Sequence, residues 1–91
     1  MSWRVKYSRT FLKELAKLPA NTRVQIETVV FGETMTEDPF QHSKLKKLVG
    51  YQEYYRIRFG NYRVGLRIDL ENNVVEFRRV LHRKDIYRKF P

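Results

Sequence analysis

Apolar and polar residues alternate at the start of the chain. Trp3, Val5 and Tyr7 fall at every second position, and polar residues separate them. Successive side chains of an extended strand point to opposite faces, so this pattern predicts a half-buried strand that ends near Tyr7.

Helical spacing replaces the alternation after this strand. Ser8 is a good N-cap residue and Pro19 cannot continue a helix, so the first helix is expected between them. Its apolar stripe consists of Phe11, Leu12, Leu15 and Leu18, and its water-facing residues are expected to be Arg9, Lys13, Glu14 and Lys17. A second helix is predicted from about 21 to 36, with Gly32 as a weak point because glycine disfavours helix interiors. Its apolar positions are Val24, Ile26, Val29, Val30 and Met35.

The middle of the chain is less regular. Asp38 and Pro39 end the helical pattern, and the polar, basic stretch 41–47 is expected to be a loop that approaches the sheet. Three further stretches then resemble strands joined by short turns, which predicts an antiparallel meander. These stretches are 54–59, 62–69 and 74–81.

The faces of the first two meander strands follow from their alternation. Their apolar residues are expected to face the core, which leaves Arg56, Arg58 and Arg63 on the opposite face. The third strand breaks its alternation at 78–79, so its faces are not assigned. The last segment, 83–90, is either a short helix or an irregular tail.

Length and composition limit the class of protein. The chain has 91 residues, which predicts a single domain over 1–91, and 42% of its residues are hydrophobic. It carries 19 Lys and Arg against 10 Asp and Glu, a net charge of +9. So basic a domain attracts polyanions, which favours nucleic acid as its partner and leaves an acidic protein as the alternative.

Other classes find little support in the residues. The chain has no cysteine and only two histidines, which lack ligand spacing, so no metal site and no cofactor are expected. The N-terminal residues lack the apolar core of a secretory signal, and no apolar run is long enough for a membrane span. We therefore expect a cytoplasmic protein without a membrane partner.

Basic and aromatic residues are candidates for a phosphate-handling site on one concave sheet face. Arginine remains protonated and offers a planar donor fork to phosphate oxygens, so it can stabilise charge that develops at a phosphate. Histidine is the better candidate for proton transfer, and a tyrosine can stack on a base. Taken singly, each residue is more often a solvated or packed side chain. The candidate catalytic residues are Arg56, Arg58, Arg63, His82, Arg83 and Tyr87.

Three runs together resemble the RelE/ParE toxin superfamily, and its RelE branch more closely. They read KLKKL at 44–48, YYRIRFGNYRV at 54–64 and VLHRKDIY at 80–87. The resemblance implies a RelE-like (microbial RNase-like) α+β fold, in which an N-terminal strand and a three-stranded meander pack on a two-helix hairpin, followed by a short C-terminal segment.

The resemblance also implies an activity, which is metal-independent cleavage of mRNA in the ribosomal A site by attack of the 2′-hydroxyl. It assigns phosphate binding to Arg63, catalysis to Arg83 and base stacking to Tyr87. Arg56 and Arg58 stand where the best-studied RelE has lysines, and arginine does not deprotonate. The general base is therefore His82, or another residue such as His42 or Glu53, or the site works mainly by positioning and charge stabilisation.

The implied partners are an acidic antitoxin of the RelB kind, mRNA and the ribosome. Operator DNA would be contacted only through the antitoxin. Residues expected to bind RNA or the ribosome are Lys44, Lys46, Lys47, Lys13, Lys17 and Arg23. Two rival functions share the fold: a ParE-like inhibitor of DNA gyrase, and a degenerate toxin that only binds its antitoxin or RNA.

Overall fold

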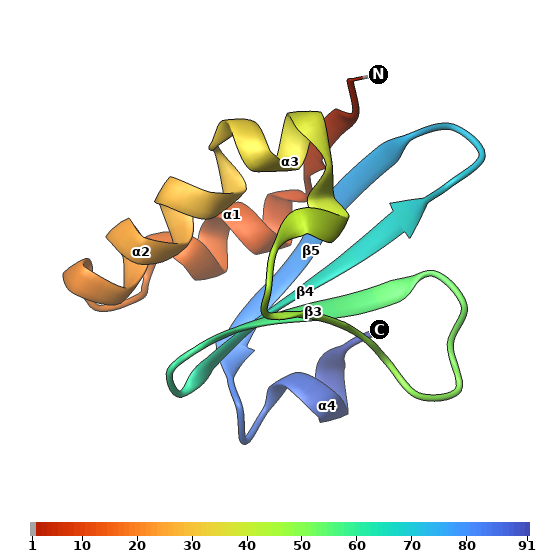
Figure 1. Ribbon diagram of the computed structural model, residues 1–91. Helices are drawn as coiled ribbons and strands as arrows, with labels where there is room; N and C mark the ends of the chain where they lie inside the picture. The colour runs from red at the N-terminus through yellow and green to blue at the C-terminus, as the bar shows by residue number, and fades with distance from the viewer. Residues whose placement is uncertain (1) are drawn as a thin grey trace.

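The computed structural model describes residues 2–91 and combines one mixed sheet with helices on both of its sides (Figure 1). Figure 1 shows α1, α2 and α3 gathered on one side of the sheet, whereas α4 lies on the other side. In chain order the elements are β1 (Arg4–Tyr7), α1 (Arg9–Ala16), α2 (Ala20–Val30), α3 (Glu33–Glu37), a 3-10 turn (Pro39–Gln41), β2 (Leu45–Lys47), β3 (Tyr54–Phe59), β4 (Tyr62–Asp69), β5 (Val74–His82) and α4 (Ile86–Lys89).

The sheet runs in the order β1-β5-β4-β3-β2. β1 is parallel to β5, and all other pairs are antiparallel. The α+β fold class, the N-terminal strand and the meander are therefore confirmed. The prediction of a loop over 41–47 is wrong in part, because Leu45–Lys47 forms the edge strand β2. A three-residue edge strand with two lysines is too short and too polar to show alternation, and lysine is typical of exposed edges.

The first helix begins as predicted. The Ser8 side chain accepts a hydrogen bond from the backbone N–H of Phe11. The second helix is not continuous: α2 ends at Val30 and α3 begins at Glu33. The break falls at Gly32, the predicted weak point, where a Cβ atom would lie 2.4 Å from the Thr28 carbonyl oxygen.

The core lies between α1, α2, α3 and the sheet. Leu12 and Val24 were expected in it, but they are 44% and 56% exposed. Only some of the apolar residues on α1 and α2 therefore face the sheet. The fully or almost fully buried residues of this core are Phe11, Leu15, Ile26, Val30, Met35, Ile57, Val64, Leu66, Ile68, Val75, Phe77 and Val80.

An irregularity in β5 explains why its faces were not assignable. Leu66 of β4 is paired with Phe77, but the preceding residue Gly65 is paired with Arg79, so Arg78 is an additional residue on β5. Such a bulge shifts the alternation of the strand. Both Phe77 and Val80 can therefore be buried, although they are three positions apart.

Glu14 of α1 lies against this bulge instead of facing water as predicted. Its carboxylate accepts hydrogen bonds from the Arg79 guanidinium, the shortest at 2.7 Å, and one from the Val80 backbone N–H at 3.0 Å. The hydrogen bond to Glu14 raises the pKa of Arg79, and desolvation opposes it to a lesser degree. The pair joins α1 to a part of β5 that β1 no longer covers.

Candidate functional site

Four cationic side chains share the sheet face opposite α1 and α2. Cross-strand partners point to the same side, and the register pairs Lys46 with Arg56 and Arg58 with Arg63. The alternating neighbours Ile57 and Val64 are fully buried in the core. We call Lys46, Arg56, Arg58 and Arg63 the basic face.

The basic face lacks counter-charges. Over residues 2–91, none of its four members forms an ion pair with a carboxylate. Arg63 instead donates to the carbonyl oxygens of Gly60 at 2.6 Å and Tyr62 at 3.1 Å. Like charges directly opposite each other on neighbouring strands are destabilising, so the Arg58–Arg63 pair favours a bound anion.

Four other arginines of the chain are neutralised by carboxylates. Carboxylates lie 2.5–3.2 Å from their guanidinium groups. These pairs are Arg67–Glu53, Arg78–Glu76, Arg79–Glu14 and Arg88–Asp85. Arg4, Arg9, Arg23 and Arg83 also form no ion pair within residues 2–91, so the basic face is distinguished by the clustering of such cations on paired strands.

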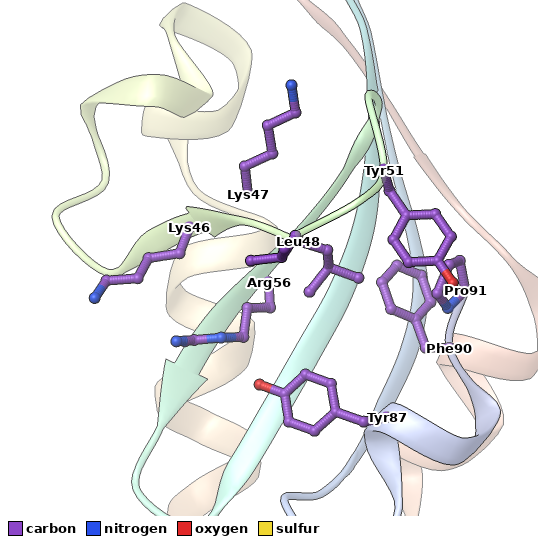
Figure 2. Close-up of a pocket in the computed structure, with 9 residues that line it drawn as sticks. Lys46, Lys47, Leu48, Tyr51, Arg56, Tyr87, Phe90 and Pro91 are labelled. Carbon is purple, nitrogen blue, oxygen red and sulfur yellow. The ribbon is translucent and has the colours of Figure 1, made fainter.

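The C-terminal segment folds over the same side of the sheet. Phe90 is 5% exposed and covers Gly65, where a Cβ atom would lie 2.7 Å from the Phe90 ring. Ile86 is fully buried, whereas Tyr87 is 55% exposed. Figure 2 shows the Tyr87 ring facing Arg56 from the C-terminal segment. Two buried residues thus hold α4 in place and leave Tyr87 beside the basic face.

A pocket of about 440 Å³ opens between this segment and the loop that follows β2. In Figure 2, Lys46 and Arg56 lie on one side of it, and Lys47 extends away from Arg56. The lining residues are Lys46, Lys47, Leu48, Val49, Tyr51, Arg56, Tyr87, Phe90 and Pro91. The pocket combines an aromatic and aliphatic lining with cations at one side.

His82 does not share the basic face, so that part of the prediction is wrong. It is the cross-strand partner of Tyr62, and the two rings meet edge to face with centroids 5.5 Å apart. Tyr62 lies on the same side of β4 as buried Val64, because the two residues are two positions apart. The bulge at Arg78 produces this orientation by shifting the alternation of β5.

Arg83 follows His82 at the end of β5 and is exposed. Its backbone N–H donates to the Asn61 carbonyl oxygen at 2.8 Å. Since Asn61 belongs to the turn between β3 and β4, Arg83 lies beside the turn that also holds the Arg63 guanidinium. The structure thus brings Arg83 to the end of the basic face that carries Arg58 and Arg63.

The other two candidates for a general base lie away from the Arg58–Arg63 pair. Glu53 is bound to Arg67 at 2.8 Å, four positions along β4 from Arg63. His42 packs on Phe59, on the helix side of β3. Partial burial, and to a lesser degree the charge of Lys44, lower the pKa of His42.

The predicted RNA-binding lysines and arginine do not form one group. Lys46 belongs to the basic face, and Lys47 alternates with it and points to the other side. Lys44 is exposed and precedes β2. Lys13 and Lys17 are exposed on and just after α1, and Arg23 is half-buried on α2, so these three lie across the sheet from the basic face.

Tyr51, Phe90 and Gly65 were not predicted from the sequence as site residues. A glycine inside a strand often marks a close approach of another group, and Gly65 was the available signal. Nothing in the sequence pattern connects Tyr51 to Phe90, because the fold alone brings their segments together. In the part of the chain from residue 2 onward, no group of three or more His, Asp or Glu residues is arranged to hold a metal ion. No helix there is long and apolar enough to cross a membrane.

Comparison with known proteins defines the class. The family described as "ParE toxin of type II toxin-antitoxin system, parDE" matches residues 5–87. The chain belongs to the RelE/ParE family of toxins of type II toxin–antitoxin systems.

Its relatives carry RelE-type names. The chain is 42% identical to Toxin RelE3 of Methanocaldococcus jannaschii, over 97% of this chain and 99% of that protein. It is 33% identical to Toxin RelG of Mycobacterium tuberculosis, over 98% and 100%.

Solved structures agree with this assignment. The toxin in the RelB–RelE antitoxin–toxin complex from Methanococcus jannaschii has a TM-score of 0.78 and 38% identity, over 94% of this chain and 99% of that one. The isolated E. coli RelE toxin has a TM-score of 0.71 and 25% identity, over 89% and 84%. The RelE branch of the predicted resemblance is thereby confirmed.

Proposed function

We propose that the chain is a ribosome-dependent endoribonuclease that cuts mRNA in the A site. The observation that carries the proposal is the Arg58–Arg63 pair, two cations opposed on neighbouring strands without a carboxylate and next to an aromatic pocket. Similarity to RelE toxins supports the same activity. We infer a cytoplasmic location, where ribosomes and mRNA are found.

The bonds that form and break in the proposed reaction all belong to the RNA. The 2′-oxygen attacks the adjacent phosphorus and forms a bond to it, while the bond from phosphorus to the 5′-oxygen breaks. The 2′-hydroxyl gives its proton to solvent water and the leaving 5′-oxygen takes one from water, which yields a 2′,3′-cyclic phosphate and a 5′-hydroxyl. Arg58 and Arg63 hold the phosphate oxygens and stabilise the negative charge that develops on them, and Arg83 assists from the adjacent turn.

Charge stabilisation and positioning supply most of the rate in this proposal. Arginine does not deprotonate in proteins, so Arg56 and Arg58 cannot act as the base. His82 is on the other side of β5, and its Nδ1 accepts a hydrogen bond from the Lys84 backbone N–H at 3.2 Å. We assign His82 the lesser role of ordering the strand end that presents Arg83. Tyr87 stacks on a base of the bound strand.

The proposed protein partner is an acidic antitoxin of the RelB type. Solved complexes from Methanococcus jannaschii and Pyrococcus horikoshii contain RelE with RelB. A net charge of +9 favours rapid, steered association with an acidic chain. Operator DNA would be reached only through the antitoxin. Lys13, Lys17 and Arg23, with Lys44 and Lys47, are proposed to contact ribosomal RNA.

The test compares mRNA with and without ribosomes. Purified protein is added to mRNA whose A-site codon is vacant on paused ribosomes, and primer extension maps the ends that result. The proposal expects cleavage within that codon and intact RNA when ribosomes are omitted. Intact mRNA on ribosomes would remove the nuclease assignment.

Inhibition of DNA gyrase is the second candidate, because the matching family is described as a ParE toxin. The unpaired arginines of the basic face favour RNA cleavage over it. A supercoiling assay run with the same preparation separates the two. Gyrase inhibition with intact mRNA would establish the second candidate.

A further inference from the structure

The pocket beside the basic face has walls from two distant parts of the chain. Tyr51, in the loop between β2 and β3, is 48% exposed, and Tyr87, in α4, is 55% exposed. In Figure 2, Leu48 and Phe90 lie between the two tyrosines. Its volume of about 440 Å³ falls within the roughly 300–1,000 Å³ of small-ligand sites, and suits a single nucleotide.

Aromatic contacts fix the Tyr51 wall. The Tyr51 ring meets Tyr54 edge to face, with centroids 5.9 Å apart and planes at 85°. Tyr54 meets Phe90 in the same way at 5.5 Å and 89°. The loop wall is therefore connected through Tyr54 to the residue that anchors the C-terminal segment. A planar ring that enters the pocket meets a surface that is already ordered, which lowers the entropic cost of binding.

The charged side chains at the pocket are all basic. Lys46 and Arg56 are cross-strand partners and both line it, and no Asp or Glu is among the lining residues. Arg56 and Arg58 are two positions apart on β3, about 7 Å along a strand. The phosphates held at Arg58 and at Arg56 can therefore belong to neighbouring nucleotides. A ring site next to a phosphate site is the pattern of single-stranded RNA recognition.

We infer that Tyr51 forms a second wall of this pocket for the base that Tyr87 stacks on, next to the cleaved phosphate. The inference rests on the proposed function and extends it by one residue, since Tyr51 then contributes to the base dependence of cleavage. Tyr51 is then a specificity residue that touches the substrate but does not take part in bond cleavage.

The test removes the Tyr51 ring and the RNA base, separately and together, and compares the cleavage rates. Single-turnover cleavage is measured on ribosomes that carry either intact mRNA or mRNA with an abasic nucleotide at one position of the A-site codon. For wild type, removing the base at one position should slow cleavage roughly fivefold to a hundredfold, the range of one lost stacking contact. Tyr51→Ala should slow cleavage of intact mRNA to a similar degree and show no further loss at that abasic position.

Three controls accompany this variant. Tyr51→Phe should retain both the rate and the base dependence, because it keeps the ring. Leu70→Ala should match wild type, since Leu70 is an exposed apolar residue outside the pocket. Thermal unfolding of each variant checks that the fold is intact.

The outcomes separate the two claims. If Tyr51→Ala leaves the rate unchanged, or slows intact and abasic mRNA equally, the base pocket is wrong and the nuclease assignment stands. If the wild-type protein cleaves no codon at all, the proposed function fails and the inference fails with it.

Discussion

Arg58 and Arg63 face each other across β3 and β4, and no carboxylate neutralises them in the described part of the chain. Arg63 is held by backbone carbonyl oxygens of the turn, so its guanidinium is oriented before any ligand binds. Such an arrangement is unfavourable for the free protein and favourable for a phosphate complex. Stability and activity should therefore respond in opposite directions when one of these charges is removed.

Arg58→Thr tests this opposition. Removing one of two like charges opposite each other should raise the free energy of unfolding by about 0.2–1 kcal/mol. The same change should slow mRNA cleavage about tenfold or more, because a donor to the developing charge is lost. Urea unfolding and single-turnover cleavage measure the two effects. The matched control is Arg78→Thr, which removes an exposed arginine paired with Glu76 and should leave cleavage unchanged.

His82→Gln measures how much the site depends on proton transfer by this residue. General acid–base catalysis typically contributes about 10²–10⁴-fold. The imidazole lies on the Tyr62 side of β5. We therefore expect the single-turnover rate to fall by less than about tenfold, which is below the range typical of general acid–base catalysis. Loss of a hundredfold or more would return His82 to the role of general base or acid.

His42 should make the fold sensitive to acid. Partial burial and the charge of Lys44 lower its pKa in the folded protein below the unfolded value of 6.5. The unfolded chain therefore takes up the proton first as the pH falls, so the stabilisation present above pH 6.5 is lost as the pH falls through the folded pKa.

His42→Asn provides the comparison, because an asparagine oxygen can accept the hydrogen bond that His42 Nδ1 accepts from the Lys44 N–H. Urea unfolding at about pH 7.5 and about pH 5, on either side of the histidine pKa, should show a smaller loss for the variant than for wild type. Equal losses would mean that His42 has the same pKa in both states.

At the scale of elements, the sequence predicted β1, α1 and the meander because each has a regular period of apolar residues. Prediction from the sequence failed where the apolar pattern was too short or where contacts between distant residues determine the structure. β2 has only three residues, and the break of alternation at 78–79 is identified as a bulge only through the pairing of β5 with β4. The three arginines of the basic face were predictable from alternation along β3 and β4, whereas the place of Lys46 depends on β2 and the orientation of His82 depends on the bulge.

The C-terminal element shows the same limit. The segment 83–90 had no clear periodicity, and contacts with β4 determine where α4 lies. Gly65 allows the Phe90 ring to approach the sheet, and that contact sets the place of Tyr87. Tyr51, Tyr87 and Phe90 are far apart in the chain, so the pocket that they line was not predictable from local patterns.

Gly65→Ala tests the role of this contact. The added Cβ atom would lie 2.7 Å from the Phe90 ring, so the ring must move. We expect a loss of about 1–3 kcal/mol in the free energy of unfolding and faster amide exchange in the C-terminal segment. Cleavage should also slow, because Tyr87 loses its fixed position.

A double-mutant cycle identifies the cause of this loss. In a Phe90→Ala background the ring is absent, so Gly65→Ala should have little further effect on stability. Additive losses from the two substitutions would contradict the proposed contact and point instead to an effect of alanine on the strand itself.

At the scale of the whole molecule, the positive charge is divided between two sides of the sheet. The basic face holds its arginines without counter-charges, and Lys13, Lys17 and Arg23 lie on the helix side. In the proposed function, this division would allow the basic face to hold mRNA while the helix side contacts ribosomal RNA. An acidic antitoxin would compete with RNA for the same positive charges. The positive charge of the protein would then serve both the proposed activity and its inhibition.

The central claim is that the basic face cleaves mRNA, and Arg63→Ala tests it most directly. The measurement is single-turnover cleavage of A-site mRNA on purified ribosomes by wild type, Arg63→Ala and the control Arg78→Ala. We predict cleavage by wild type and Arg78→Ala and a loss of about a hundredfold or more for Arg63→Ala, the effect of removing a donor to developing charge. Equal rates for all three proteins would contradict the assignment of this face as the active site.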